Sequence, residues 1–110
     1  KIRDVAIHNA TINAIETPYK IMKIIDKSLI DIEYVIKKSN PNCLSDLGVA
    51  VSNLKSAVYG ALLNVHINLK DLQDESYSSN KSKESNKIFD SVEKKCSKLM
   101  LLINSELVHD

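Results

Sequence analysis

The sequence predicts an all-α protein, a bundle of long helices. Apolar residues recur at steps of three and four in an early stretch that contains Ile15, Tyr19, Met22, Ile25, Leu29, Ile32 and Ile36. A late stretch repeats the pattern with Phe89, Val92, Cys96, Leu99, Ile103 and Leu107. The 110 residues include two glycines, two prolines and one phenylalanine, few of the residues that make turns and sheets. We expect three long helices and no strand in one small domain.

The first helix should cover residues 1 to about 38. Pro18 interrupts its apolar pattern, because proline has no backbone N–H to donate within a helix. Two interpretations remain open. Thr17 caps a new helix whose first position is Pro18, or Pro18 kinks one long helix.

A break is predicted where Ser39, Asn40, Pro41 and Asn42 follow one another. The second helix should begin near Ser45 or Asp46, both good N-cap residues, and end at about residue 69. Residues 71 to about 83 are polar and predict a connection to the last helix.

The second helix is apolar on nearly every side between residues 47 and 69. A helix without a polar face is normally surrounded by other helices, and two neighbours do not suffice to cover it. We therefore expect the bundle to be completed by a second copy of the chain or by a further segment of the same protein.

Charge and cysteine content exclude several classes of function. The formal net charge is +1, which gives no electrostatic basis for binding nucleic acid or an anionic membrane, and no apolar run approaches the ~20 residues of a membrane span. His8, His66 and His109 do not cluster with acids or cysteines in a metal-binding spacing. Cys43 and Cys96, without a disulfide framework, suit the reducing cytoplasm; we expect both to be buried, and their pairing stays open.

Polar and small residues form a stripe along the second helix. At ~100° and ~1.5 Å per residue the stripe is about 80° wide and ~33 Å long, and it contains Asp46, Asn53, Ala57, Gly60, Asn64 and Asn68. Asn64 and Asn68 are one turn apart, so both amides can address one partner. That partner is a ligand, or else a neighbouring helix that packs closely at Gly60. Asp46 has the alternative role of a helix cap.

Four ordered blocks within residues 12–75 resemble the cyclodeaminase/cyclohydrolase family. They are Thr17-Pro18-Tyr19, the turn and Ser-Asp-x-x-Val-Ala segment at 40–50, the Gly-Ala to Asn-Val-x-Ile-Asn-Leu segment at 60–69, and the acidic Asp74. This family comprises the C-terminal domain of formiminotransferase-cyclodeaminase and methenyltetrahydrofolate cyclohydrolases.

The resemblance implies an all-helical homodimer that binds a tetrahydrofolate derivative as substrate near the subunit interface. From the residue spacing we expect no metal. The implied reaction closes 5-formiminotetrahydrofolate to 5,10-methenyltetrahydrofolate with release of ammonia, or interconverts the methenyl and 10-formyl forms. Ser45, Asp46, Asn64 and Asn68 match the family blocks and are the expected substrate-binding residues.

The chain departs from the family pattern in one respect. Family domains begin with a Pro-x-Pro-Gly-Gly-Gly-Ser-like turn and an Asp-centred motif, and neither occurs here. Residues 1–110 therefore correspond to the C-terminal part of one such domain, and we expect the catalytic residues in a preceding segment. The alternatives are a non-catalytic module that keeps the fold for binding or oligomerisation, and an unrelated helical interaction protein.

Overall fold

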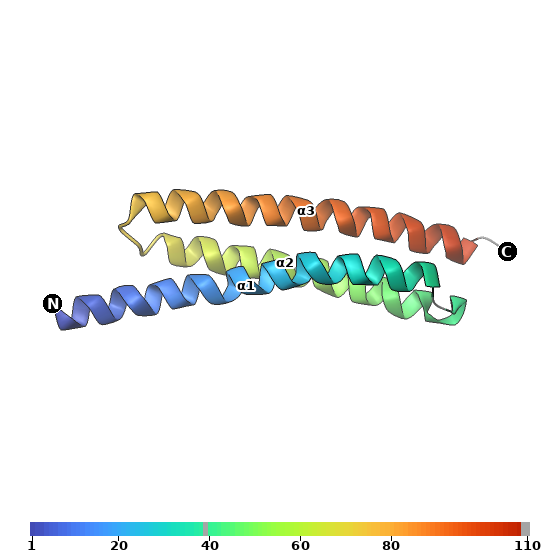
Figure 1. Cartoon of the computed structure of the whole chain (residues 1–110), viewed down its shortest axis with the longest axis horizontal. Coiled ribbons are helices and arrows are strands. Elements are labelled where there is room, and N and C mark those ends of the chain that lie inside the picture. Colours follow the sequence, from blue (N-terminus) through green and yellow to red (C-terminus); the bar gives the residue numbers. More distant parts are fainter. Residues whose placement is uncertain (39, 109–110) are drawn as a thin grey trace.

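A computed structural model describes residues 1–38 and 40–108. Its elements are α1 (Ile2–Lys38), the 3₁₀ turn η1 (Pro41–Cys43), α2 (Leu44–Leu69) and α3 (Glu75–Val108), and the described residues form no strand. The predicted all-α class is confirmed. The bundle measures 66 × 19 × 17 Å, with α1 and α3 running in one direction and α2 in the other (Figure 1). Ser39 of the predicted turn and His109 lie outside the described residues.

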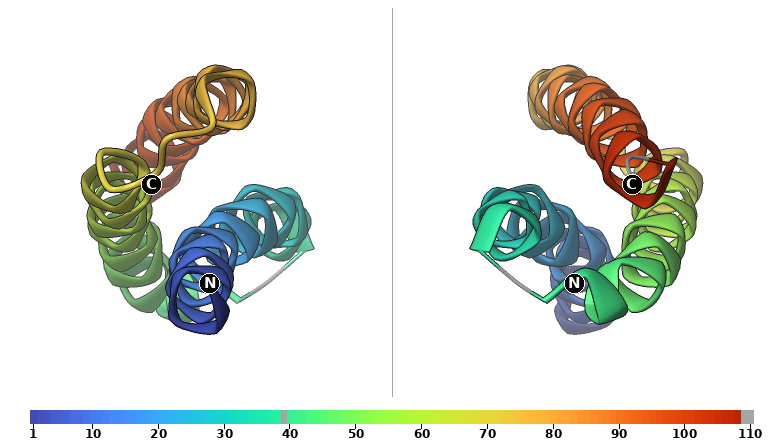
Figure 2. Two further views of the ribbon diagram at one scale, coloured as in Figure 1. Left: turned by 90° about the vertical axis from the view of Figure 1, so that its left-hand side faces the viewer. Right: turned by 90° about the vertical axis from the view of Figure 1, so that its right-hand side faces the viewer.

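The three helices surround a common centre when the bundle is seen from its ends (Figure 2). α1 and α3 each contact α2 more extensively than they contact one another. Over the described residues, none of the helices is long and apolar enough to cross a membrane.

α1 is one helix that contains Pro18, so the interpretation with a new helix capped by Thr17 is wrong. Its predicted apolar stripe is buried, apart from Ile32, which is half-buried. Pro18 itself is buried, because its ring replaces a polar N–H with apolar surface at the helix side that faces the bundle.

α2 begins at Leu44, slightly earlier than predicted. The side chain of Asn40 accepts a hydrogen bond from the backbone N–H of Asn42 (3.0 Å), which starts the 3₁₀ turn at Pro41 and leads directly into the helix. Ser45 and Asp46 are therefore not N-caps. Both are exposed in the first turn, where the carboxylate of Asp46 lies at the favourable, positive end of the helix dipole.

α3 begins at Glu75, so the prediction of a connection as far as residue 83 is wrong. Asp74 caps the helix, because its Oδ1 accepts a hydrogen bond from the backbone N–H of Tyr77 (3.0 Å). The first turns of α3 contact α1 through the polar side chains of Tyr77, Lys81 and Glu84, which composition alone does not reveal.

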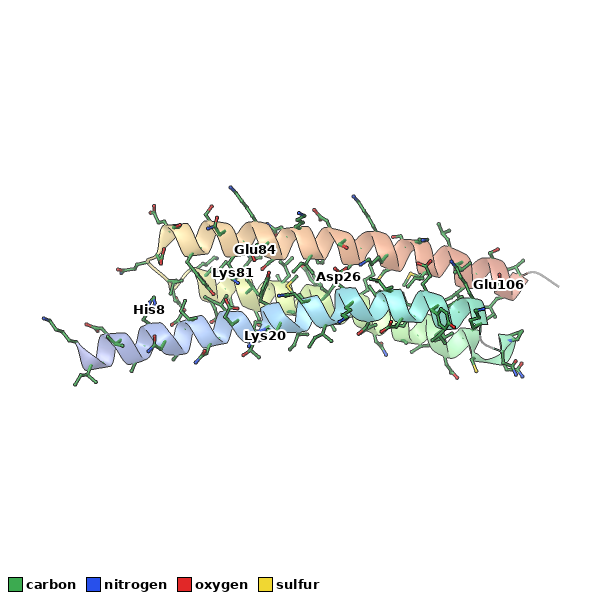
Figure 3. All side chains as sticks on the ribbon, in the orientation of Figure 1. His8, Lys20, Asp26, Lys81, Glu84 and Glu106 are labelled. Atoms are coloured by element: carbon green, nitrogen blue, oxygen red, sulfur yellow. The ribbon has the colours of Figure 1, made fainter. Side chains whose placement is uncertain are left out.

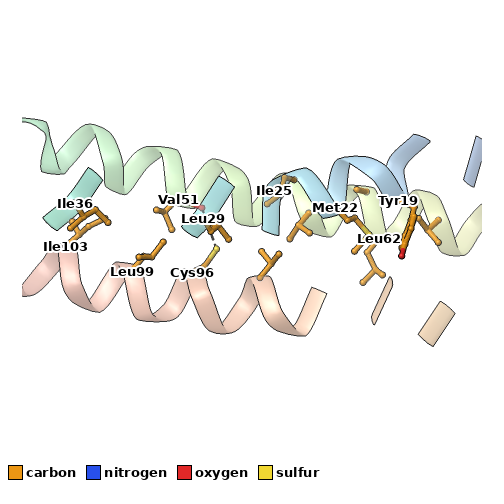
Figure 4. Packing of buried hydrophobic residues seen from close by; sticks show 14 of the residues in the cluster. Tyr19, Met22, Ile25, Leu29, Ile36, Val51, Leu62, Cys96, Leu99 and Ile103 are labelled. Atoms are coloured by element: carbon orange, nitrogen blue, oxygen red, sulfur yellow. Dashed lines mark hydrogen bonds between the residues drawn. The ribbon is translucent and has the colours of Figure 1, made fainter. Parts of the chain in front are cut away.

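The core repeats every seven residues. Buried residues at this spacing are Ile15, Met22, Leu29 and Ile36 of α1, Leu44, Val51, Val58 and Val65 of α2, and Ser85, Val92 and Leu99 of α3. Figure 4 shows Cys96 of α3 between these rows, with its Sγ 4.0 Å from the carbonyl oxygen of Val51. A seven-residue repeat keeps the apolar side of each helix turned toward its partners over the whole length of the bundle.

Two side chains, one thiol and one apolar, differ from expectation. Cys43 is exposed in η1 instead of buried, whereas Cys96 is buried as predicted, and both thiols are free. Burial raises the pKa of the Cys96 thiol. Leu107 is exposed in the last turn of α3.

Polar contacts join α1 to α3. Most of the partners are 65 residues apart in the chain, and they are Glu16 with Lys81 (2.9 Å), Tyr19 with Glu84 (2.7 Å), Asp26 with Ser91 (2.8 Å) and Glu33 with Lys98 (3.2 Å). Lys95 adds a second contact to Asp26 at 2.8 Å. A constant offset means that the two helices are parallel in one fixed register (Figure 3).

The tightest of these contacts surround Lys81. Its side chain is only 12% exposed, it pairs with Glu16, and its Nζ lies 3.9 Å from the centre of the Tyr19 ring. Tyr77 donates its hydroxyl to Glu16 as well. Burial alone would raise the pKa of Glu16, but the hydrogen bonds from Tyr77 and Lys81 outweigh it and lower the pKa. Burial, with the bond to Glu84, raises the pKa of Tyr19 to about 12.

We predict that Ser85→Ala raises the melting temperature. Ser85 is fully buried and its hydroxyl has no hydrogen-bond partner among the described residues, which costs about 1–3 kcal/mol. Ser97→Ala, at an exposed position of α3, is the control for the helix propensity that alanine adds. Equal stabilisation by both substitutions in thermal melts would show that the Ser85 hydroxyl carries no desolvation cost.

We also predict that Glu16→Gln lowers stability at neutral pH and has little effect in acid. Because the folded-state pKa lies below the usual 4.5, the contribution of Glu16 is present above that pH and disappears as the pH falls through the lowered pKa. The expected loss at pH 7 is a few tenths to about 1 kcal/mol. Urea unfolding from pH 7 to pH 3 measures it, with Glu106→Gln at an exposed position as control. A pH-independent difference would contradict the assignment.

Candidate functional site

The four residues predicted to bind substrate all lie on α2, at its two ends. Ser45 and Asp46 are exposed in the first turn; near the other end Asn64 is exposed and Asn68 is half-buried. The 18 residues between Asp46 and Asn64 correspond to about 27 Å along the helix. Ser45 and Asp46 therefore lie together at one end of α2, and Asn64 and Asn68 lie together near the other end. The four residues do not line one pocket.

The side chain of Asn68 replaces a backbone hydrogen bond that is missing in α1. Pro18 cannot donate a backbone hydrogen bond, so the carbonyl of Ala14, four residues earlier, loses its partner within α1. The Nδ2 of Asn68 donates to that carbonyl (3.2 Å) and also to the carbonyl of Asn64 (2.9 Å). This is the contact that the packing interpretation of Asn68 expects. A role in substrate binding stays a prediction.

The middle of the polar stripe is open to solvent. A Cβ atom added to Gly60 would meet no atom within 4 Å, and Asn53 and Ala57 before it are exposed. Close packing at Gly60 therefore does not occur among the residues that the structure describes. The surface over Gly60 is available to a ligand or to another polypeptide chain.

Exposed apolar side chains accompany this stripe. Ile21 and Val35 follow Ala14 along α1 at seven-residue steps, on the side where Asn68 reaches it, and Ile24 lies beside them. We call this surface the open face and define it as Ile21, Ile24 and Val35 of α1 with Val49, Asn53, Ser56, Ala57, Gly60, Leu63, Asn64 and Ile67 of α2.

Known proteins of one family match most of the chain. The family model described as formiminotransferase-cyclodeaminase matches residues 1–87. The chain is 30% identical over 103 residues to the formimidoyltransferase-cyclodeaminase of Dictyostelium discoideum, a match that covers 94% of the chain and 19% of that relative.

The chain belongs to the formiminotransferase-cyclodeaminase family.

Two further relatives are a mammalian enzyme and a bacterial one. The formimidoyltransferase-cyclodeaminase of Rattus norvegicus is 34% identical over 73 residues, 66% of the chain and 14% of the relative. The methenyltetrahydrofolate cyclohydrolase of Methylorubrum extorquens is 39% identical over 59 residues, 53% of the chain and 28% of the relative. The chain thus spans less than a third of each of these relatives. The resemblance noted in the sequence is confirmed, and the family match includes all four predicted site residues.

Other polar groups of this family member lie away from the open face. His66 lies against α3, with its Nε2 3.1 Å from the Oδ1 of Asn86. A hollow of about 480 Å³ near the α2–α3 connection is lined by Asp4, His8, Thr11 and Asp71, among others. Sequence analysis missed this hollow, although Asp4 and His8 are one turn apart. In the part of the chain that the structure describes, no three His, Cys, Asp or Glu side chains are placed to hold a metal ion.

We predict that Asn68→Ala costs about 0.5–1.5 kcal/mol of stability, because the Ala14 carbonyl loses its donor within the protein. The cost should shrink in a Pro18→Ala background, since alanine at 18 restores the helical N–H. A double-mutant cycle in urea measures the coupling. Zero coupling would mean that Asn68 does not compensate for the proline.

Proposed function

We propose that this chain acts in folate-dependent one-carbon metabolism, as part of a formiminotetrahydrofolate cyclodeaminase or a methenyltetrahydrofolate cyclohydrolase. The observation that carries the proposal is the family match over residues 1–87, which includes the whole of α1 and α2. In this proposal residues 1–110 are the C-terminal part of one family domain. They contribute one wall of the folate cleft and much of a subunit interface.

The proposed ligand is a tetrahydrofolate derivative lying along the open face. A reduced folate is elongated, and the polar stripe from Asp46 to Asn68 is ~33 Å long. Both hydrogen bonds of Asn68 use Nδ2, which leaves its Oδ1 as an acceptor for an N–H of the ligand. Asn64 offers an exposed amide one turn away. Ser45 and Asp46 would orient polar groups at the other end of the ligand.

The proposed chemistry is proton transfer at a carbon held between two nitrogens. Ring closure or opening passes through a tetrahedral carbon, and a positioned carboxyl group is the natural acid or base for it. We assign that group to another part of the complete assembly, which this chain would form as a homodimer or with a companion chain. The two free thiols support a cytoplasmic location, since a reducing compartment preserves them.

One observation favours a second function, a non-catalytic module of the same fold. Asn68, which the family pattern assigns to the ligand, already bonds to α1 and thereby stabilises the bundle. A family member that kept only binding or oligomerisation would retain such a residue for its structural role.

Native mass spectrometry with tetrahydrofolate present tests the proposal. We expect the protein to carry a folate-sized adduct, or to be isolated with a companion chain that completes the site. We further predict that Asn64→Ala weakens folate affinity about tenfold or more, the effect of losing an interaction worth about 1.4 kcal/mol.

The matched control is Asn104→Ala, an exposed asparagine on α3, which should leave the affinity unchanged. A bare chain or homodimer without adduct would favour the non-catalytic module. Equal affinities of the Asn64→Ala variant and the wild type would remove Asn64 from the site.

A further inference from the structure

A hollow between α2 and α3 gathers basic and hydroxyl side chains. Its volume is about 380 Å³, and we call it the serine hollow, defined by His66, Leu69 and Lys70 of α2 with Ser78, Ser79 and Ser82 of α3. Lys70 is positively charged, and His66 becomes so when it is protonated. The lining residues, all within the described part of the chain, include no carboxylate. A concave surface whose charges are all positive attracts anions.

The serine hollow is separate from the open face. His66 precedes Asn68 by two residues, which places the two side chains about 160° apart around α2. Asn68 reaches α1, whereas His66 contacts Asn86 of α3. A ligand in the serine hollow therefore leaves the surface assigned to folate free.

The hydroxyl of Ser78 has no hydrogen-bond partner among the described residues. Its Oγ is buried, although Ser78 lines the hollow. A buried hydroxyl without a partner is destabilising and calls for an explanation. Rotation about χ1 between staggered positions changes the direction of a serine hydroxyl by about 120°, so Ser78 can turn toward a ligand in the hollow. Ser79 and Ser82 each offer a further hydroxyl donor.

The ring of His66 has a second nitrogen to offer. Its Nε2 lies 3.1 Å from the Oδ1 of Asn86, an acceptor, so Nε2 carries a hydrogen. Only the protonated ring also carries a hydrogen on Nδ1 and can donate it to an anion. Lys70, one turn later on α2, is the other ionisable group of the lining, and the α3 residues that contact or border His66 are Asn86 and the three serines, which carry no charge. Anion binding therefore favours protonated His66.

The arrangement of the donors suits a tetrahedral oxyanion better than a carboxylate. The donors belong to two helices and approach a ligand from different sides, whereas the two oxygens of a carboxylate lie in one plane. The volume of the hollow is within the ~300–1,000 Å³ of small-molecule sites, so it has room for an organic group beside the anion. The apolar side chain of Leu69 provides a surface for that group.

We propose that the serine hollow binds a small phosphomonoester, whose phosphate group is held by Lys70, protonated His66 and the serine hydroxyls. The organic group of the ligand packs against Leu69. This site goes beyond the proposed function, since it uses none of the residues assigned to folate.

Titration of the isotope-labelled protein with phenyl phosphate at about pH 6, followed by NMR, tests the site. The amide signals of residues 66–70 and 78–82 should shift together, with a dissociation constant on the order of 1 mM or lower. Lys70→Gln should weaken binding at least about fivefold, because it removes a charged donor. Lys94→Gln, at an exposed position of α3 outside the hollow, is the matched control and should leave the affinity unchanged.

Ser78→Ala separates a ligand-binding role from a structural one. The substitution removes a hydroxyl without a partner among the described residues, so the melting temperature should not fall, while the affinity for phenyl phosphate should drop about threefold or more. A lower melting temperature with unchanged affinity would give Ser78 a structural role and remove it from the site.

Sulfate measures the contribution of His66. It remains a tetrahedral dianion over about pH 5 to 8, the range in which histidine changes its charge, so the pH alters only the charge of the protein. The affinity for sulfate should fall as the pH rises through this range, and His66→Gln should abolish that fall. An affinity of the wild type that does not depend on pH would contradict the role of His66.

Inorganic phosphate and benzoate distinguish the alternative ligands. Both should bind more weakly than phenyl phosphate. Inorganic phosphate of equal affinity would replace the phosphomonoester by free phosphate, and benzoate of equal affinity would exclude a tetrahedral oxyanion, so either result would overturn the proposal. Signals that do not shift would overturn it too, as would equal weakening by Lys70→Gln and Lys94→Gln. None of these measurements involves folate, so their outcome is independent of the folate adduct.

Discussion

The buried row of α2 is the constraint on which the rest of the bundle depends. Leu44, Val51, Val58 and Val65 are at most 3% exposed and face both neighbours at seven-residue steps. α1 and α3 each contact α2 more extensively than they contact each other. Shifting α2 by one residue would rotate the whole row by about 100°, away from the interior, so this row constrains how both other helices pack. The parallel alignment of α1 and α3 follows, since each is antiparallel to the same helix.

The interior changes character along the bundle. At the end where α2 begins, the core contains aliphatic residues such as Ile36, Leu44 and Ile103. Toward the α2–α3 connection the inward positions of α3 become Ser78 and Ser85, whose hydroxyls are buried and unpaired among the described residues. Lys81 and Glu16 join α1 to α3 at this polar end. This partly buried ion pair aligns α1 with α3 at the polar end, while the aliphatic end buries apolar side chains from all three helices.

Much of the fold could be predicted from apolar periodicity. The stripe from Ile15 to Ile36 identified α1 and its buried side, because apolar residues at seven-residue steps all lie on one side of a helix. The first turns of α3 could not be found this way, since Lys81 and Tyr77 depend on Glu16, a residue more than 60 positions earlier. Amino-acid composition indicates which secondary structure a segment prefers, but it does not indicate which distant residues the side chains contact.

Only part of the candidate site could be predicted, because helical geometry relates residues of one helix and does not relate residues of different helices. Helical geometry correctly placed Asn64 and Asn68 on one side of α2, one turn apart. It could not show that Asn68 reaches across to α1, because that contact depends on how the helices pack. The free carbonyl of Ala14, however, follows from Pro18 by counting four residues back along the helix.

The Pro18 and Asn68 pair has a consequence for the history of the sequence. The need for a side-chain donor at 68 exists only while position 18 lacks its backbone N–H, although 50 residues separate the two positions. In a lineage that replaces Pro18, the fold no longer requires the hydrogen bond from Asn68. In a lineage that loses Asn68 first, the carbonyl of Ala14 has no donor within the protein. The two positions should therefore co-vary among relatives in which Asn68 serves the fold alone. An asparagine retained after the proline is gone would mark lineages in which it is kept for another reason.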